Sequence, residues 1–521
     1  MTPKQDRSTE SRNTTKEPDL SGAPAAPPPP PSRRGLLLVA MGLLAAGLAV
    51  ALVAVFYRPD YVVLVPFDEP EEAWFRARIA DFAEKHHVRL TTRAYANEDE
   101  LERLVRAETL ERKRRVLVAL APRAALAPLS EDDLVLPTDD VRGTPRARAL
   151  AAAMAPEAIA PAAARGGGLR FVPASISTPL LFYSRARVAE AVAGWESDRA
   201  RIDAALRRAG GSGLPQQYRL EADPNDWDTF DIAVLAAWWA DRPYDGLRGP
   251  RIAHAAIGDA ATVDLATRAF SQGVTAADLL DLDAVQLRDA LAWESVFFAA
   301  GWYHPGMMKQ NWEPNGLLSA AAQGQVFLGW LDMPRLFRLH GTGAPGLEGV
   351  LKDPADLGVA RVPRGVSLDL AKSLPARGGD SRAALDGSWW TVPRTTPDAP
   401  LAFELVELLS GREFQADWAR AFGRLPARRD LLAELDLLFE TDWQFTIARI
   451  AKKQALDRGR TQPGTIRWRN NGRALVAAWR EMCVEKETTN LLALGMALER
   501  HAGAVAAGHR SAPADSAKRG D

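Results

Sequence analysis

Aromatic and acidic side chains are the groups in this sequence with the clearest chemical use. The chain contains fifteen tryptophans. Their flat indole faces can cover the C–H groups of a ligand, while carboxylates, amides and arginines pair with its hydroxyl groups. A polar group buried without a partner costs about 1–3 kcal/mol, so a binding cleft needs such pairing. A tryptophan is nevertheless more often part of a core than of a binding site, so composition alone does not decide between the two.

Hydrolytic chemistry has one candidate pair of acids, Asp332 and Asp386. Cleavage of a glycosidic bond needs two carboxylates about 5–9.5 Å apart, and the sequence does not give their separation. The chain contains no GxSxG nucleophile elbow and no HExxH zinc pair. The glycine run at 166–168 lacks the strand–glycine–helix context of a dinucleotide site. We therefore predict no catalytic residues.

Metal, cofactor and nucleic-acid sites are not indicated either. Cys483 is the only cysteine, so it can form neither an internal disulfide nor a cysteine metal cage. His86 and His87 are adjacent, and neighbours on a helix point in different directions, so we predict no metal site and no cofactor. The net charge is -1, with 65 basic and 66 acidic residues. Without a basic stripe, we expect no nucleic-acid partner.

Alternating strands and helices must position these groups. Residues 61–65 and 116–120 are short apolar runs typical of buried strands, and 88–92 has the pattern of another strand. Between these strands, apolar residues recur at helical spacing in 74–82 and 99–110. This alternation predicts an α/β fold with a parallel sheet and helices on both faces.

Helical spacing dominates the later part of the chain, over 227–239, 287–298, 401–409 and most of 431–501. In the first of these helices, we predict that Trp227 anchors the start and that Asp226 is the N-cap residue. Trp238 and Trp239 are expected on the buried face of the same helix.

The N-terminal part of the chain is expected outside the fold. Residues 1–34 are polar and rich in proline, so we predict a disordered tail there, and another over 506–521. Residues 35–57 carry no charge and, at ~1.5 Å per residue, are long enough to span ~30 Å of hydrocarbon. We predict a transmembrane signal anchor, with cleavage left open. Arg33 and Arg34 precede it, which places the N-terminus in the cytoplasm.

Four groups of segments, in chain order, resemble family 1 of the bacterial extracellular solute-binding proteins, which includes maltose-binding protein. FAEKHHVRLTT resembles the opening of the family, and LRFVPASISTPLLFYSRARV resembles the strand that crosses between its lobes. Asp226-Trp227-Asp228-Thr229-Phe230 resembles a family helix opening. The last group runs from GQVFLGWLDMPRLF through LGVARVPRG to LDGSWWTVPRTTPDAPLAFELVELLSGREFQADWARAFGRLPARRDL, and it is the most specific.

This resemblance implies a periplasmic-binding-protein type II fold, with two α/β lobes that are joined by hinge strands and close over a ligand. Within a domain over 58–505, it implies a first lobe over about 58–172 and 393–428. The second lobe would then cover about 173–388 and 429–505. Ligand sites in such sheets lie at the strand ends that face the crevice.

The resemblance also implies the ligand contacts. Trp330 follows a strand at the place where relatives carry an aromatic residue that stacks on the ligand. Trp389 and Trp390 precede a hinge strand and point in opposite directions, so that one of them can reach the cleft. The other expected contacts lie beside these tryptophans, in one loop or at the crossing between lobes: Asp332, Ser388, Trp302, Tyr303, Ser177 and Thr178.

The function implied is that of a non-enzymatic receptor at the bacterial inner membrane, with its large domain in the periplasm or outside the cell. It would capture a solute, favoured to be a sugar, for an ABC permease, and contact the lipid bilayer through 35–57. Three alternatives remain open. These are a sensor that signals to a membrane partner, a glycoside-acting enzyme that uses Asp332 and Asp386, and a lobe pair that has lost binding and serves as a scaffold.

Overall fold

The chain divides into two units, Met1–Arg58 and Pro59–Asp521. The computed structural model describes residues 41–45, 58–107, 110, 114–162, 169–208, 212–246, 248–282, 285–341, 348–368, 379–482, 496–501 and 503. Residues 41–45 are helical. The rest of the predicted membrane helix over 35–57 lies outside the described residues, as do both predicted tails and Cys483. Among the helices that are described, none combines the length and apolarity needed to cross a membrane.

The second unit begins with the predicted strand–helix alternation. Strand β1 (Asp60–Val65) pairs in parallel with β2 (Arg89–Ala94) on one side and with β3 (Arg115–Pro122) on the other. Helices α2 (Glu69–Lys85) and α3 (Glu98–Arg106) connect these strands and pack their apolar side chains against the sheet. The parallel sheet expected from the sequence is therefore confirmed for these three strands.

Strand β11 (Gly459–Thr461) pairs in parallel with the start of β9 (Ala383–Thr391), beside the main order of this first sheet. Three other later strands extend the sheet, and they pair antiparallel with β3 and with one another. They are β4 (Val172–Ser177), β9 and β10 (Leu425–Pro426). The order is β10-β4-β9-β3-β1-β2, so β9 lies in the interior of the sheet. Both β4 and β9 belong to the first sheet along their whole length. The implied boundaries at 172 and 393 instead assign nearly all of these two strands to the second lobe or to the connection between lobes.

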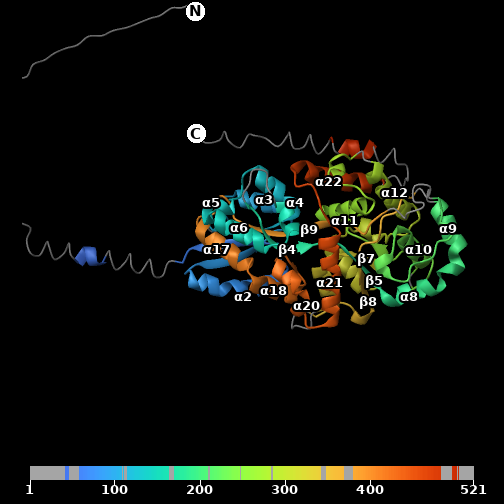
Figure 1. The fold of residues 1–521 in the computed structure, drawn as a ribbon, viewed down its shortest axis with the longest axis horizontal. Coiled ribbons are helices and arrows are strands. Elements are labelled where there is room, and N and C mark those ends of the chain that lie inside the picture. The colour runs from blue at the N-terminus through green and yellow to red at the C-terminus, as the bar shows by residue number, and fades with distance from the viewer. Residues whose placement is uncertain are drawn as a thin grey trace, which may run out of the picture. The chain divides into compact units, whose positions relative to one another are not determined.

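The second sheet has the order β6-β7-β5-β8. Its strands are β5 (Leu180–Ser184), β6 (Ile252–Ala253), β7 (Leu328–Leu331) and β8 (Leu357–Ala360). Helices α8 (Arg185–Gly194), α10 (Thr229–Ala240), α11 (Gly258–Ser271), α12 (Val285–Ala299) and α15 (Met333–His340) belong to the same part of the chain. We call each sheet with its helices the first and the second lobe. Figure 1 shows α8 and α10 at the far side of the second lobe from α2 and α3.

Several elements connect the lobes. The chain passes from β4 to β5 through Thr178 and Pro179. Helix α21 (Asp442–Asp457) contacts strands of both sheets, and Figure 1 shows it between the two lobes. Helix α22 (Ile466–Arg480) packs on α11 of the second lobe, while two of its arginines form ion pairs with acids of α3 in the first lobe. The lobes are thus in contact on more than one side of the crossing strands.

The start of α10 differs from the prediction. Asp228, not Asp226, is the N-cap residue, and its carboxylate accepts hydrogen bonds from the backbone N–H groups of Phe230 (2.8 Å) and Asp231 (3.3 Å). The Asp231 carboxylate accepts from the Asp228 N–H in return, at 2.7 Å, which completes a capping box. Asp226 ends a short 3-10 turn before the helix. The prediction chose the wrong aspartate because both precede the apolar run.

The tryptophans of this region are placed as predicted. Trp227 is fully buried, and its indole N–H donates to the Glu221 carbonyl oxygen at 2.8 Å, which ties the preceding loop to the helix start. Trp238 and Trp239 are buried on α10.

Candidate functional site

A small pocket lies where the chain crosses from the first sheet to the second. We call it the cleft pocket. Its volume is about 60 Å³, and its polar lining comes from both lobes: Ser177, Asp264, Trp330, Asp332, Arg335 and Asp386. Because the ends of β4 and β7 and part of β9 all meet here, residues far apart in the sequence converge.

The second lobe supplies an indole and an ion pair. Trp330 lies near the end of β7, and the chain leaves this strand directly into α15. Asp332 is the N-cap residue of α15, since its carboxylate accepts from the Arg335 backbone N–H at 3.4 Å. The same carboxylate forms an ion pair with the Arg335 guanidinium at 2.6 Å. Helix capping therefore fixes one acidic group next to Trp330.

The first lobe supplies Asp386 through close pairing of two strands. Asp386 on β9 lies opposite Ser177 on β4. The next residue, Gly387, has φ +155°, and a Cβ atom there would lie 2.3 Å from the Ser175 carbonyl oxygen. Only glycine allows the two strands to approach this closely, and the approach brings Asp386 to the pocket.

Asp386 shares a single arginine with another acid. Arg123 Nη2 contacts Asp259 Oδ1 at 3.2 Å, whereas Arg123 Nε lies 3.9 Å from Asp386 Oδ1. Within the described residues, Asp386 Oδ1 is buried and has no hydrogen-bond partner. Burial, reinforced by the nearby Asp259 carboxylate, raises the pKa of Asp386 to about 7. Asp386 thus brings a carboxyl group with one unpaired oxygen to the lining of the pocket.

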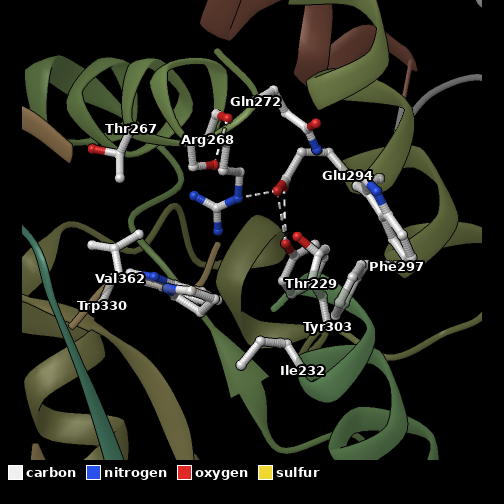
Figure 2. Close-up of a pocket in the computed structure, with 13 residues that line it drawn as sticks. Thr229, Ile232, Thr267, Arg268, Gln272, Glu294, Phe297, Tyr303, Trp330 and Val362 are labelled. Carbon is white, nitrogen blue, oxygen red and sulfur yellow. Dashed lines mark hydrogen bonds and ion pairs between the residues drawn. The ribbon is translucent and has the colours of Figure 1, made fainter. Parts of the chain in front are cut away.

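A second cavity, of about 40 Å³, lies within the second lobe, and Trp330 lines it too. Figure 2 shows Arg268 between Trp330 and Glu294, with Tyr303 close to the same carboxylate. The Arg268 guanidinium carbon lies 4.5 Å from the centre of the Trp330 ring. The cavity is large enough for about one water molecule. Trp330 therefore separates an internal charged cluster from the cleft pocket.

The structure brings together three of the nine expected contact residues, Ser177, Trp330 and Asp332. Thr178 follows Ser177 in the crossing; it is buried, and its hydroxyl has no partner among the described residues. Ser388 is occupied elsewhere, because its hydroxyl bonds to that of Ser175 at 2.8 Å between β4 and β9.

The other expected aromatic contacts are core residues that line no part of the cleft pocket. Trp389 and Trp390 do point in opposite directions, but each is buried in a different apolar cluster, Trp390 against Phe75 and Trp418. The Trp389 indole N–H donates to the Ala158 carbonyl oxygen at 2.9 Å. Trp302 packs edge-on against Phe297.

Tyr303 lines the internal cavity rather than the cleft pocket. Its hydroxyl donates to the Glu294 carboxylate, with 2.9 Å to Oε2.

Sequence reasoning missed the remaining polar groups of the pocket as binding residues. For Asp386, the sequence suggests only half of a catalytic pair with Asp332. Arg335 carried a usable signal, since it lies one helical turn after Asp332. Asp264 on α11 carried none, because its place depends on how α11 packs against β9 and α12. Burial raises the pKa of Asp264 to about 6, although His254 and Arg268 act in the opposite direction.

The fold of this chain is similar to that of solved sugar-receptor structures. The GacH receptor of Streptomyces glaucescens, solved without ligand and with acarbose, has a TM-score of 0.60 at 15% identity, over 86% of this chain and 99% of that one. The sugar-binding protein MalE of Xanthomonas citri gives 0.56 at 16%, over 87% and 98%. An ABC transporter solute-binding protein of Thermotoga lettingae, bound with α-D-tagatose, gives 0.60 at 14%, over 86% and 100%.

Two sequence comparisons differ in outcome. A search of curated proteins found no match, whereas a family model matches most of the chain. The family model described as bacterial extracellular solute-binding protein matches residues 77–447, which include every strand of the second sheet and most of the first. The resemblance noted in the sequence is thereby confirmed, and the chain belongs to the bacterial extracellular solute-binding protein family.

Proposed function

We propose that this protein captures a carbohydrate between its two lobes and delivers it to an ABC-type importer. The observation that carries the proposal is the cleft pocket, where the Trp330 indole meets carboxylates from both lobes, Asp332 and Asp386. An indole suits the C–H face of a sugar ring, and carboxylates accept hydrogen bonds from its hydroxyl groups. The solved structures with acarbose and with tagatose support the same ligand class.

Binding requires the lobes to move apart. The cleft pocket measures about 60 Å³, whereas sites for small molecules typically have about 300–1,000 Å³. The crossing at Thr178-Pro179 and the approach to β9 are the places where the chain can bend, because they connect the two sheets. A saccharide would enter the open form, and closure would then bring Trp330 and Asp386 against it.

Ligand binding is tested with the full-length chain, purified in mild detergent, in a thermal-shift screen against neutral mono- and oligosaccharides. A ligand at a hundredfold excess over its Kd stabilises the folded state by about 2.7 kcal/mol. We expect one saccharide class to raise the melting temperature, and Trp330→Ala and Asp386→Asn to reduce that rise.

Trp74→Ala is the matched control, because Trp74 packs on Phe414 and Phe422 in the first lobe, away from the pocket. The same samples, analysed for saccharide products after long incubation, should show no turnover. If no saccharide changes the melting temperature, carbohydrate capture is wrong.

Membrane attachment through residues 35–57 is the second part of the proposal. It is supported by the uncharged length of this segment and by the arginines before it. After cell fractionation, the full-length chain should remain in the membrane pellet under alkaline wash, and a variant without 35–57 should appear in the soluble fraction. A soluble full-length chain would contradict the anchor without affecting ligand capture.

Delivery to an importer is tested by uptake. Cells that lack the protein should lose uptake of the saccharide found in the thermal-shift screen, and the full-length gene should restore it. Normal uptake in the deleted strain would exclude delivery as its function.

A further inference from the structure

Trp330 is backed by a cation that is largely, but not fully, buried, since the Arg268 side chain is 15% exposed. The Arg268 guanidinium carbon lies 4.5 Å from the centre of its ring, within the ~6 Å over which a cation and an aromatic face attract each other. Trp330 comes from β7 and Arg268 from α11. Because Trp330 borders both the cleft pocket and the internal cavity, the contact joins the cleft to the interior of the second lobe.

Arg268 is itself fixed by two different groups. Its Nε forms an ion pair with Glu294 Oε1, and its Nη1 donates to the Asp264 carbonyl oxygen at 3.0 Å. A guanidinium held at two of its nitrogens has a defined plane. The orientation that Arg268 offers to Trp330 is therefore set by α11 and α12 together.

Glu294 is held just as firmly. It is buried, it accepts from the Tyr303 hydroxyl, and its Oε2 lies 3.1 Å from His254 Nε2. Burial acts to raise the pKa of Glu294, but Arg268 and His254 hold it below its ordinary value. The carboxylate thus stays charged and keeps its partner in place. Figure 2 shows the contacts that Arg268 and Tyr303 make with this carboxylate.

Stability alone does not explain this arrangement. Removing one partner of a buried ion pair is costly, yet replacing the whole pair with apolar side chains of similar volume is often neutral or stabilising. The Arg268–Glu294 pair lies behind a residue that lines the cleft pocket, which suggests that it fixes the orientation of a neighbouring side chain. That side chain is Trp330.

We propose that Arg268 and Glu294 are positioning residues for Trp330. Glu294 fixes the guanidinium, and the guanidinium holds the indole in the orientation that a ligand meets in the cleft pocket. This inference rests on the proposed function in so far as Trp330 contacts the carbohydrate. The positioning itself can be measured without any ligand.

The test compares Glu294→Gln, Arg268→Lys and the double variant Arg268→Met/Glu294→Gln in the full-length chain. The near-ultraviolet circular dichroism of Trp330 is obtained as the difference between each protein and the same protein with Trp330→Phe. We expect Glu294→Gln to lose most of the Trp330 signal, and Arg268→Lys, which keeps a cation, to retain part of it. The double variant should regain melting temperature but not the signal.

The first lobe offers a matched control. Glu71 pairs with Arg424 at 2.8 Å, and Arg424 lies 5.4 Å from the centre of the Trp418 ring. Glu71→Gln should lower the melting temperature and leave the Trp330 difference spectrum unchanged.

Retention of the wild-type Trp330 spectrum in the double variant would mean that the pair is only structural, and the inference would be wrong. If the double variant does not fold, Glu294→Gln decides the question by the same spectrum.

Ligand binding is then measured separately, with maltose as the probe. If maltose binds the wild type, Glu294→Gln should weaken its affinity on the order of tenfold, the lower end for groups that orient a contact residue. If maltose does not bind, carbohydrate capture is judged by the saccharide screen, and the spectrum alone judges the positioning. The two failures are therefore distinguishable.

Discussion

The two lobes contain the same trio of side chains in different settings. In the first lobe, Glu71 holds Arg424, and Arg424 lies over Trp418, which is fully buried. In the second lobe, Glu294 holds Arg268, and Arg268 lies over Trp330, which borders the cleft pocket.

The difference comes from where each tryptophan stands. Trp418 lies on α18 (Arg412–Phe422), packed between Phe67, Trp390 and Phe414, whereas Trp330 lies near the end of a strand that faces the other lobe. A buried charge behind an indole is therefore not by itself a sign of function. It becomes one when the indole also lines a crevice.

The largest expected difference between the two trios is the effect on stability of removing the buried tryptophan of the first. Trp418→Ala should lower the free energy of unfolding by about 3–5 kcal/mol, because a fully buried indole leaves a large cavity. Saccharide affinity of the remaining folded protein should stay within twofold of the wild type. Urea unfolding followed by fluorescence gives the first quantity, and titration calorimetry gives the second. A large loss of affinity would show that the first trio also serves the cleft.

The next effect is on binding. Trp330→Ala should weaken the affinity for the saccharide found in the screen by about 2 kcal/mol, roughly 30-fold, which is typical of a central contact residue. Trp390→Ala is the control, since Trp390 stacks on Phe75 inside the first lobe. Titration calorimetry on both proteins checks the prediction. Equal losses of affinity would remove the distinction between the two tryptophans.

The pH dependence of stability provides a third test. Burial raises the pKa of Asp386 from 3.8 to about 7, so between these values the folded chain binds a proton that the unfolded chain releases. This group therefore makes stability fall as the pH rises from about 4 to about 7.

Asp386→Asn should make the unfolding free energy fall less steeply between about pH 4 and about pH 7. The change in slope should be less than about 1.4 kcal/mol per pH unit, which is the most that one titrating group can contribute. Melting temperatures measured across this pH range check it. An unchanged slope would mean that Asp386 is solvated as a free carboxylate in solution.

The smallest effect concerns a surface contact between the lobes. Arg338 of α15 pairs with Asp68 of the first lobe at 2.5 Å, and both side chains are exposed. Arg338→Gln should change stability by only about 0–1 kcal/mol, since exposed ion pairs contribute little. Small-angle scattering of the two proteins without ligand should show the variant slightly more open. A strong loss of stability would make this pair a major clamp between the lobes.

The sequence by itself determined the local elements and the family. The alternation of apolar runs gave β1, α2, β2, α3 and β3, because period and length distinguish strands from helices when each packs one face on a core. The ordered segments of the resemblance gave the two-lobe fold. Trp330 near the end of β7 and Asp332 directly after this strand could also be predicted, since both stand at a strand end.

Tertiary structure alone decided which side chains the cleft receives. Nothing local distinguishes Trp389 and Trp390 from Trp330, yet the first two are enclosed in apolar clusters, whereas Trp330 stands near the end of β7 and lines the cleft pocket. Asp386 reaches the pocket only because Gly387 lets β4 and β9 approach. The pairing of Glu294 with Arg268 depends on the contact between α11 and α12. Such contacts arise from packing between distant segments, and no spacing in the sequence encodes them.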